Sequence, residues 1–389
     1  MRYGRSWGRL GMIYKLSDLC DYVKEKIDVK ELTRKNYIST ENMLPNKRGI
    51  SIASSIPSIL QTQAFKKGDI LISNIRPYLK KIWYAEYDGG CSNDVLVLRA
   101  KKGVNKQYLY YLLADDRFFD YAMAFSKGTK MPRGDKTAIM NYSVISFSNE
   151  KQDNIAEILN VLDKKIFIND KINRNLQEQA KAIFEQELLK VEKIPPSWKK
   201  GSLIDIAEFL NGLAMQKFRP GDGEIAIPVL KIKELRQGSC DSSSDVCSSK
   251  IKSEYIIHDG NVIFSWSGSL LVDFWCGGEC GLNQHLFKVS SKKFDRWFYY
   301  AWTLYHLDRF IAVASDKATT MGHIKRDELS KAEVLIPDEL DYRRIGKMME
   351  PIYDMIISNR IANRKLAILR DQLIPNLMSG KIDVSDIEK

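Results

Sequence analysis

The chain has 389 residues, 44% hydrophobic and 28% charged, which is the composition of a globular protein of two or three domains. No apolar run approaches the roughly 20 residues that cross a bilayer, and the first ten residues lack the apolar stretch of a secretory signal. We therefore expect a cytoplasmic protein and exclude a membrane-spanning one. The net charge of +11 favours a polyanionic partner, most commonly nucleic acid.

Taken in chain order, the sequence first predicts a globular unit of mixed α and β structure. Short apolar runs bounded by Gly, Asn or Asp predict strands at 69–73 and 95–98. The aromatic-rich stretch 106–125 has helical spacing, and the polar, glycine-bearing segment 126–135 predicts a loop.

A long helix is predicted next, over residues 148–192. Its apolar and asparagine residues alternate in steps of four and three, which is the a/d pattern of a coiled-coil seam. The seam consists of residues 155, 159, 162, 166, 169, 173, 176, 180 and 183. Pro195 and Pro196 then predict a stop and a linker.

The second half predicts the same order of elements. A strand is expected at 261–265, a helical stretch at 295–314 and a loop at 314–323. A second seam follows at residues 345, 349, 352, 356, 359, 363, 366, 370 and 373. Pro351 predicts a kink or a late start of this helix.

Four seam positions are asparagines: Asn169, Asn173, Asn359 and Asn363. A buried asparagine costs stability but sets the register and orientation of a helix pair. In an antiparallel pair the four side chains would meet in one polar layer. The alternative is that they lie at the solvated edge of the helices.

The chain repeats itself at an offset of about 190 residues. Asn169 and Leu176, for example, recur as Asn359 and Leu366. The repeat predicts two similar halves, each a globular unit followed by a helix. We place the segments at 1–147 (first unit), 148–192 (first helix), 193–337 (second unit) and 338–389 (second helix and tail).

Catalytic and metal-binding motifs are missing. The sequence has no G-x-x-x-x-G-K-[ST] phosphate loop and no G-x-G-x-x-G dinucleotide motif. The clustered carboxylates of a metal-dependent nuclease are also absent. The six cysteines have spacings that differ from common zinc patterns, so we expect reduced thiols: Cys20, Cys91, Cys240, Cys247, Cys276 and Cys280. We therefore expect a non-catalytic chain without a cofactor or metal of its own.

Several segments are similar to a known family. In the helices they are Ile155–Ile166, Ile172–Phe184 and Leu373–Ile382, and in the second unit Ile263–Gly268 and Asn283–Phe287. These segments resemble the DNA-specificity subunits of type I restriction–modification systems, and the resemblance covers nearly the whole chain.

The resemblance implies a mixed α+β fold of two tandem globular α/β target-recognition domains. Two long helices would separate them and form an antiparallel coiled coil, giving a pseudo-two-fold internal repeat. Each domain would read one half of a split site in double-stranded DNA. Two methylation subunits would dock on the helices, and restriction and translocation subunits would join them. S-adenosylmethionine, ATP and Mg²⁺ would belong to those partners, which would methylate adenine and restrict DNA.

Reading a base sequence requires side chains that donate and accept hydrogen bonds at base edges, positioned by phosphate contacts. In the first half, Arg76 is a candidate for guanine and Asn74 for adenine. The full set of candidates there is Ser73, Asn74, Arg76, Tyr78, Lys80, Lys81, Lys127, Thr129, Lys130 and Arg133. Lys80 and Lys81 are expected at phosphates.

The second half offers a corresponding set of candidates: Ser265, Trp266, Ser267, Ser269, Asn283, Gln284, His285, Thr319, Thr320, His323 and Lys325. Each has a simpler explanation. Surface cations are usually only solvated, Asn283 is suited to capping a turn, and Trp266 is suited to the core.

Two other functions stay open. A standalone, duplicated DNA-processing enzyme would cut DNA with Mg²⁺ and no partner. A coiled-coil scaffold would bind proteins only, and it would leave the net charge of +11 and the basic loops unexplained. An RNA-binding duplication would need an aromatic stacking motif, and the sequence shows none of known type.

Overall fold

The computed structural model describes residues 12–316 and 326–385. Contacts divide the chain into two compact units: Met1–Lys164 with Leu366–Lys389 (unit 1), and Lys165–Lys365 (unit 2). This division cuts both long helices, whereas the predicted boundaries treat each helix as a separate segment. Those boundaries stay a prediction.

Unit 1 begins with a two-stranded antiparallel ribbon, β1 (Met12–Lys15) with β10 (Ser143–Ser146), followed by the short helix α1 (Leu16–Leu19). Its first four-stranded sheet is antiparallel throughout. The strand order is β2 (Cys20–Tyr22), β9 (Val95–Ala100), β6 (Ile70–Ser73) and β7 (Ile82–Tyr84). The strands predicted at 69–73 and 95–98 are therefore confirmed as β6 and β9.

A second four-stranded sheet completes the β structure of unit 1. Its order is β3 (Lys26–Asp28), β5 (Gln61–Phe65), β8 (Gly89–Cys91) and β4 (Tyr37–Ile38), and only the β4–β8 pair is parallel. A Cβ at Gly89 would lie 2.2 Å from the carbonyl oxygen of Asn36, so the close approach here requires glycine. The connections include the 3₁₀ turns η1 (Val29–Glu31) and η2 (Pro77–Leu79).

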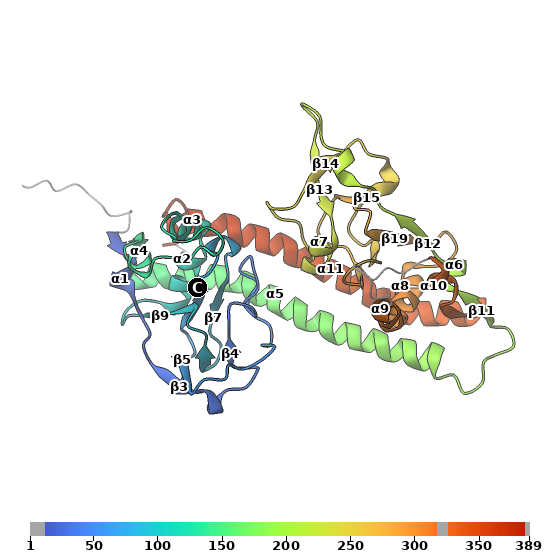
Figure 1. Ribbon diagram of the computed structural model, residues 1–389, viewed down its shortest axis with the longest axis horizontal. Helices are drawn as coiled ribbons and strands as arrows, with labels where there is room; N and C mark the ends of the chain where they lie inside the picture. Colours follow the sequence, from blue (N-terminus) through green and yellow to red (C-terminus); the bar gives the residue numbers. More distant parts are fainter. Residues whose placement is uncertain (1–11, 317–325, 386–389) are drawn as a thin grey trace, which may run out of the picture. The chain divides into compact units, whose positions relative to one another are not determined.

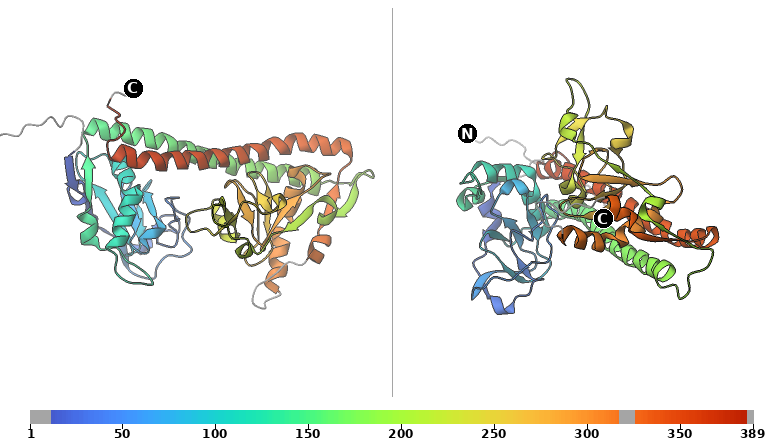
Figure 2. Two further views of the ribbon diagram at one scale, coloured as in Figure 1. Left: turned by 90° about the horizontal axis from the view of Figure 1, so that it is seen from above. Right: turned by 45° about the vertical axis from the view of Figure 1, so that its right-hand side comes forward.

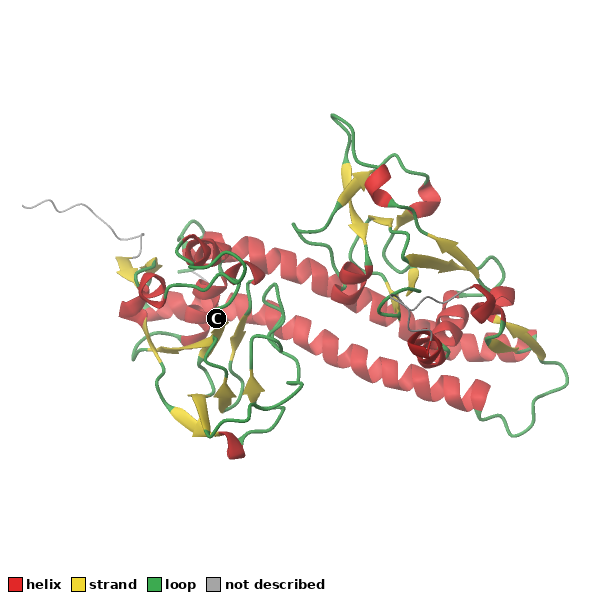
Figure 3. Ribbon diagram, viewed as in Figure 1, coloured by secondary structure: helices red, strands yellow, loops and turns green. Residues whose placement is uncertain are grey.

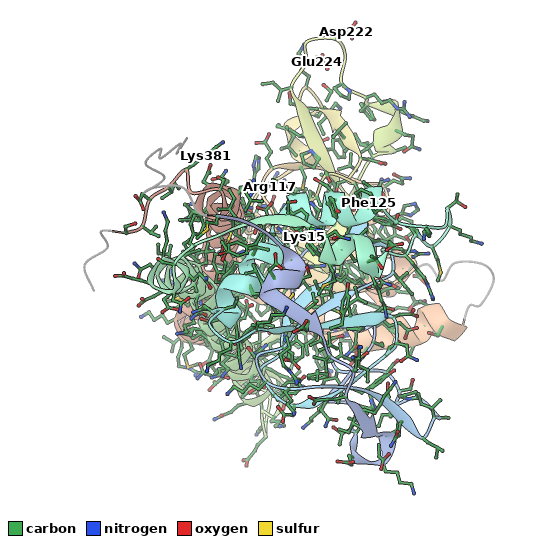
Figure 4. The ribbon with its side chains drawn as sticks, turned by 90° about the vertical axis from the view of Figure 1, so that its left-hand side faces the viewer. Lys15, Arg117, Phe125, Asp222, Glu224 and Lys381 are labelled. Carbon is green, nitrogen blue, oxygen red and sulfur yellow. The ribbon has the colours of Figure 1, made fainter. Side chains whose placement is uncertain are left out.

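The helical stretch predicted at 106–125 forms two helices, α2 (Lys106–Ala114) and α3 (Asp116–Ala124), with α4 (Lys136–Met140) after them. The break is at Asp115, whose backbone is extended and whose side chain accepts a hydrogen bond from the Arg117 amide. Aspartate is a preferred helix N-cap because it satisfies such a free amide. Arg117, labelled in Figure 4, also donates to the Pro375 carbonyl at 3.3 Å.

Unit 2 repeats this arrangement. Its ribbon pairs β11 (Lys199–Ser202) with β20 (Glu333–Ile336), and α6 (Leu203–Ile206) follows β11. The antiparallel sheet has the order β12 (Glu208–Asn211), β19 (Leu286–Ser290), β16 (Val262–Ser265) and β17 (Leu271–Phe274). Element by element, this is the order of β2, β9, β6 and β7, so the predicted repeat extends to topology.

The second sheet of unit 2 differs in one strand. Its order is β14 (Val246–Ser248), β13 (Ala226–Leu230), β18 (Cys280–Leu282) and β15 (Ile256–Ile257). In both units the central strand, β8 or β18, has one parallel and one antiparallel neighbour. The remaining strand is β3 in unit 1, where it pairs with the antiparallel neighbour β5. In unit 2 it is β14, which pairs with the parallel neighbour β13.

Helices and turns complete unit 2. The connections contain η4 (Met215–Lys217), α7 (Ile232–Gln237) and η5 (Ser253–Tyr255). Asp222 and Glu224 lie near the tip of the loop before β13 (Figure 4). The helices α8 (Arg296–Tyr305), α9 (Leu307–Asp316) and α10 (Arg326–Ser330) repeat α2 to α4 (Figure 3). Trp297, Phe298 and Phe310 from this group are fully buried in the core.

The two long helices are α5 (Asn149–Phe184), which continues into the π-helical turn η3 (Glu185–Leu189), and α11 (Glu339–Met378) (Figure 1). Pro351 lies inside α11, so the predicted late start of this helix is wrong. Proline cannot donate to the carbonyl four residues earlier. Because Pro351 and Lys347 are both exposed, water can satisfy that carbonyl.

Both predicted seams are turned away from solvent, since every seam residue is buried or half-buried. In unit 1, Asp163 of α5 contacts Arg370 of α11, and Asn154 contacts Val384 beyond it. In unit 2, Asn169 contacts Asn363 and Asn173 contacts Asn359. Within each unit the helices therefore run antiparallel (Figure 2). The predicted mixed α+β class with tandem units and an antiparallel helix pair is confirmed.

None of the helices in the described ranges combines the length and the hydropathy of a membrane-spanning segment.

Candidate nucleic-acid interface

In unit 1 the structure brings the two predicted candidate segments together. The 73–81 turn follows β6, and the 126–134 loop follows α3. Ile75 and Arg133 form an antiparallel β-bridge, and the Arg76 amide donates to the Pro132 carbonyl at 2.8 Å. The Gly134 amide donates to the Asn74 carbonyl at 3.1 Å. The two segments therefore form one continuous surface.

The backbone of this surface is strained. Arg76 (φ 53°) and Lys80 (φ 50°) flank η2 in the left-handed region. A third segment, 44–49, contributes Asn46 (φ 57°) and Lys47 (φ 58°). These four are the only non-glycine residues with positive φ in the part of the chain that the structure describes. Each such conformation costs roughly 1–3 kcal/mol, and they cluster at functional sites.

The 44–49 segment is not among the candidates that the sequence predicts. The Asn46 amide donates to the Leu79 carbonyl and the Lys47 amide to the Lys80 carbonyl, both at 2.9 Å. Its run of Pro, Asn, Lys, Arg and Gly is a basic turn signal. Only its position against the 73–81 turn identifies it as part of the site.

The candidate cations differ in their availability. Arg76 and Lys130 are exposed, and neither side chain has an acceptor among the described residues. Lys127 pairs with Asp135, and Arg133 pairs with Asp94, each at 3.0 Å. Both of those cations keep more than half of their side-chain surface exposed. All four therefore present positive charge at the surface, with Arg76 and Lys130 the least compensated. The remaining polar candidate of this loop, Thr129, is exposed too.

Lys80 and Lys81 are engaged within the protein. The Lys80 ammonium lies 2.7 Å from the Asp116 carboxylate. The Lys81 ammonium donates to the Thr40 carbonyl at 2.6 Å. Burial lowers the pKa of Lys81, and the nearby charge of Arg76 lowers it further. Contact of these two lysines with phosphate stays a prediction.

The other candidates of the 73–81 turn divide into shaping and exposed residues. Ser73 is buried and donates to the Ile75 carbonyl at 2.9 Å. The Asn74 side-chain oxygen is enclosed and has no hydrogen-bond partner within the described chain. Tyr78 is half exposed, at 50%. Tyr78 and Arg76 are therefore exposed on the turn, whereas Ser73 supports it and Asn74 is half-buried.

In unit 2 the turn after β16 contacts the segment 283–285, which lies between β18 and β19. The Ser265 hydroxyl donates to the carbonyls of Ser267 (3.3 Å) and Ser269 (2.9 Å). The Ser267 hydroxyl lies 3.0 Å from Nδ1 of His285. The Trp266 amide donates to the His285 carbonyl at 3.4 Å.

The unit 2 candidates also divide by exposure. Ser265, Ser267 and Asn283 are buried. Asn283 accepts from the His285 amide at 3.3 Å, so it caps a turn. Ser269 is exposed, and Trp266, Gln284 and His285 are half-buried. Thr319, Thr320, His323 and Lys325 lie outside the described residues.

The four seam asparagines meet as two pairs in unit 2. The Asn169 amide donates to Asn363 at 2.8 Å, and the Asn359 amide donates to Asn173 at 2.9 Å. Asn169 and Asn173 are buried, and Asn359 and Asn363 are half-buried. The structure thus forms the expected polar layer, while its role in setting register stays a prediction.

The cysteines are all free thiols. Burial raises the pKa of Cys20 and of Cys91 to about 12. Within residues 12–316 and 326–385, no three His, Cys, Asp or Glu side chains are grouped so as to hold a metal ion.

Comparison with known proteins identifies the family to which this chain is similar. A profile of the type I restriction modification DNA specificity domain matches residues 11–178 and 195–366. The MjaIX specificity subunit of Methanocaldococcus jannaschii is 23% identical, with 92% of this chain and 88% of that protein aligned. The HindI specificity subunit of Haemophilus influenzae is 20% identical, with 95% and 99% aligned. The crystal structure of a type I restriction–modification S subunit from M. genitalium has the same fold, with a TM-score of 0.55, 14% identity and 98% of both chains covered.

The two matched segments span most of the chain, one in each repeat, and each includes the elements that bear the candidate surfaces. The chain therefore belongs to the type I restriction–modification DNA specificity family and is a specificity subunit that recognises DNA targets.

Proposed function

We propose that this chain reads a bipartite sequence in double-stranded DNA and thereby directs adenine methylation and restriction by partner subunits. The observation that carries the proposal is the equivalence of the two candidate surfaces. Each lies on the connection that leaves the central strand of the antiparallel sheet, β6 to β7 in unit 1 and β16 to β17 in unit 2. The residues on the two connections differ, so the two half-sequences are expected to differ.

The exposed side chains suit this role. An arginine reads guanine through two parallel hydrogen bonds in the major groove. Arg76 is exposed on a turn whose backbone is held by its neighbours, which limits the entropy lost on binding. Lys130 is a point charge suited to a phosphate. In unit 2, Gln284 and His285 offer donors and acceptors for base edges.

The helices suit the partners. Ile168 and Ile172 of α5 are exposed (49% and 39%), as are Ile368 and Leu369 of α11 (51% and 44%). Exposed apolar side chains on a helix favour a protein contact. We assign those of α5 in unit 2 and those of α11 in unit 1, each taken by itself, to contacts with two methylation subunits, which restriction and translocation subunits would join. S-adenosylmethionine, ATP and Mg²⁺ would act in those subunits, and this chain would be non-catalytic.

The test is to co-express the chain with its methylation subunit in a host that lacks DNA methylation, and to sequence the host DNA for N6-methyladenine. We expect a split motif that appears only when both chains are present. Replacing residues 15–147 or 198–336 with those of another specificity subunit should change one half of the motif at a time.

Two results would overturn the proposal. A stable complex of the two chains that methylates nothing would indicate a scaffold. Cleavage of DNA by the purified chain with Mg²⁺ alone would indicate a standalone enzyme.

A further inference from the structure

A network of hydrogen bonds and ion pairs between side chains runs through unit 1 and includes residues of both long helices. The Tyr111 hydroxyl of α2 donates to Asp163 of α5 at 2.7 Å. Arg370 of α11 binds the other oxygen of Asp163, also at 2.7 Å. Arg370 contacts its neighbour Asp371 at 2.9 Å. These contacts fix the two helices to each other and to α2.

The same network of ion pairs continues to the two strained turns, 44–49 and 73–81. The Lys47 ammonium lies 3.7 Å from the Asp371 carboxylate and 2.8 Å from that of Asp116, at the start of α3. Lys80 contacts the second oxygen of Asp116 at 2.7 Å. Asp371 on α11 is therefore connected to the 73–81 turn through two lysines and one further carboxylate.

Two cations of this network are buried. The Lys47 side chain is 7% exposed and that of Arg370 is 12% exposed, so both cations have lost most of their hydration. The carboxylates of Asp116 and Asp371 are 54% and 44% exposed, so each pair joins a buried cation to a half-exposed carboxylate. Removing a carboxylate leaves a desolvated cation with fewer partners, which is costly. Burial alone would raise the pKa of Asp116, but Lys47 and Lys80 outweigh it and hold that pKa below its ordinary value.

The network also explains how the strained backbone is maintained. Lys47 and Lys80, the two lysines that bind Asp116, are themselves two of the four described non-glycine residues with positive φ. Strained conformations persist only where the surrounding structure over-determines them. The Asp116 carboxylate holds both side chains, while the Lys47 amide binds the Lys80 carbonyl.

The network belongs to one half of the repeat. At the 190-residue offset, Asp163, Arg370 and Asp371 correspond to Tyr353, Ala180 and Lys181. Unit 2 attaches α11 to its sheet differently, through Arg360 with Asp273 (2.6 Å) and Arg364 with Asp259 (2.8 Å). A change in the network should therefore affect one unit only.

We propose that Lys47 and Asp371 are positioning residues that hold the 73–81 turn, so that sequence reading by unit 1 depends on the packing of α5 against α11. This inference rests on the DNA-reading role proposed above. By thermodynamic reciprocity, a partner that shifts α11 when it docks will alter the reading of one half-sequence, and target DNA will alter the docking of that partner.

The test uses the full chain co-expressed with its methylation subunit. The methylated fraction is measured at sites that carry one wrong base in either half, together with the thermal midpoint of the purified complex. Lys47→Met and Asp371→Asn should each lower discrimination about tenfold in the unit 1 half, since one misplaced base contact accounts for a change of this size. The unit 2 half should be unchanged, and Lys47→Arg should retain wild-type discrimination.

Lys151→Met is the matched control. Lys151 pairs with Asp383 at 3.0 Å, is 11% exposed and belongs to the same unit, but it contacts neither strained turn. It should lower the thermal midpoint without changing discrimination in either half.

The outcomes separate the two proposals. A wild-type chain without a split motif would overturn both. If the wild-type chain yields a split motif, and Lys47→Met and Asp371→Asn discriminate as well as wild type, the positioning role alone is overturned. Equal relaxation of both halves would overturn it too, because that is the result of general destabilisation.

Discussion

At the scale of single residues, Arg76 combines backbone strain with an exposed guanidinium. Its left-handed backbone suits glycine better than arginine, yet the turn has arginine there. Its amide is held by the Pro132 carbonyl, which keeps the side chain at a fixed point of the surface. The arginine at this position therefore lowers the stability of the turn while it supplies the side chain proposed to read DNA.

Replacing Arg76 by glycine and by alanine separates these two contributions. Both variants should lose target discrimination to the same extent, because both remove the guanidinium. Arg76→Gly should be more stable than Arg76→Ala by about 1 kcal/mol, since only alanine keeps the left-handed strain. Equilibrium unfolding in denaturant and the methylation assay measure the two effects. Equal stability of the two variants would show that the turn is not strained at this residue.

At the scale of elements, the helix pair combines an apolar seam with a polar layer. Asn173 accepts from Asn359, and its own amide lies 3.5 Å from the Ile356 carbonyl. Asparagine pairs of this kind add little to the free energy of folding. They disfavour every other register of the two helices, because a shifted register leaves one buried amide unpaired.

A double-mutant cycle tests the Asn173–Asn359 pair. Asn173→Leu alone should lower the free energy of unfolding by about 1–3 kcal/mol, because it leaves the partner amide unpaired. Adding Asn359→Leu should recover most of that loss. Asn175→Leu on the exposed side of α5 is the control and should change little. The free energies of unfolding are measured by circular dichroism of the helices in denaturant. Additive effects of the two seam substitutions would contradict the pairing.

At the scale of the whole molecule, only some of the 60 lysine and arginine side chains are available to DNA. Lys47 and Lys80 are paired with Asp116, and Lys250 is paired with Glu224. The cations without an acceptor, such as Lys130, are those that release counterions when DNA binds.

The salt dependence of DNA affinity therefore distinguishes free from paired lysines. Lys130→Ala should reduce the slope of log affinity against log salt by about 0.9, without altering the preferred sequence. Lys250→Ala, which removes the partner of Glu224 at 2.9 Å, should leave the slope unchanged. Titrations of duplex DNA from about 50 to 200 mM salt measure both slopes. An unchanged slope for Lys130→Ala would remove it from the phosphate contacts.

The sequence by itself determined the features that depend on local periodicity and on the comparison of its two halves. The seam residues from 155 to 183 follow from a 3.5-residue repeat, and the duplication follows from matches such as Asn169 with Asn359. The strands β6 and β16 follow from short apolar runs with turn residues at their ends. Candidate residues on the turns after these strands were found in the same way.

Only the tertiary structure decided how those candidates are used. It brought the 44–49 segment against the 73–81 turn, paired Lys80 with Asp116, and buried Ser265 and Asn283. It also capped α3 at Asp115, which splits a stretch of uninterrupted helical spacing. The physical reason is the same in each case. Exposure, strain and charge pairing depend on contacts between residues far apart in the chain, and no local pattern of side chains specifies which of those contacts form.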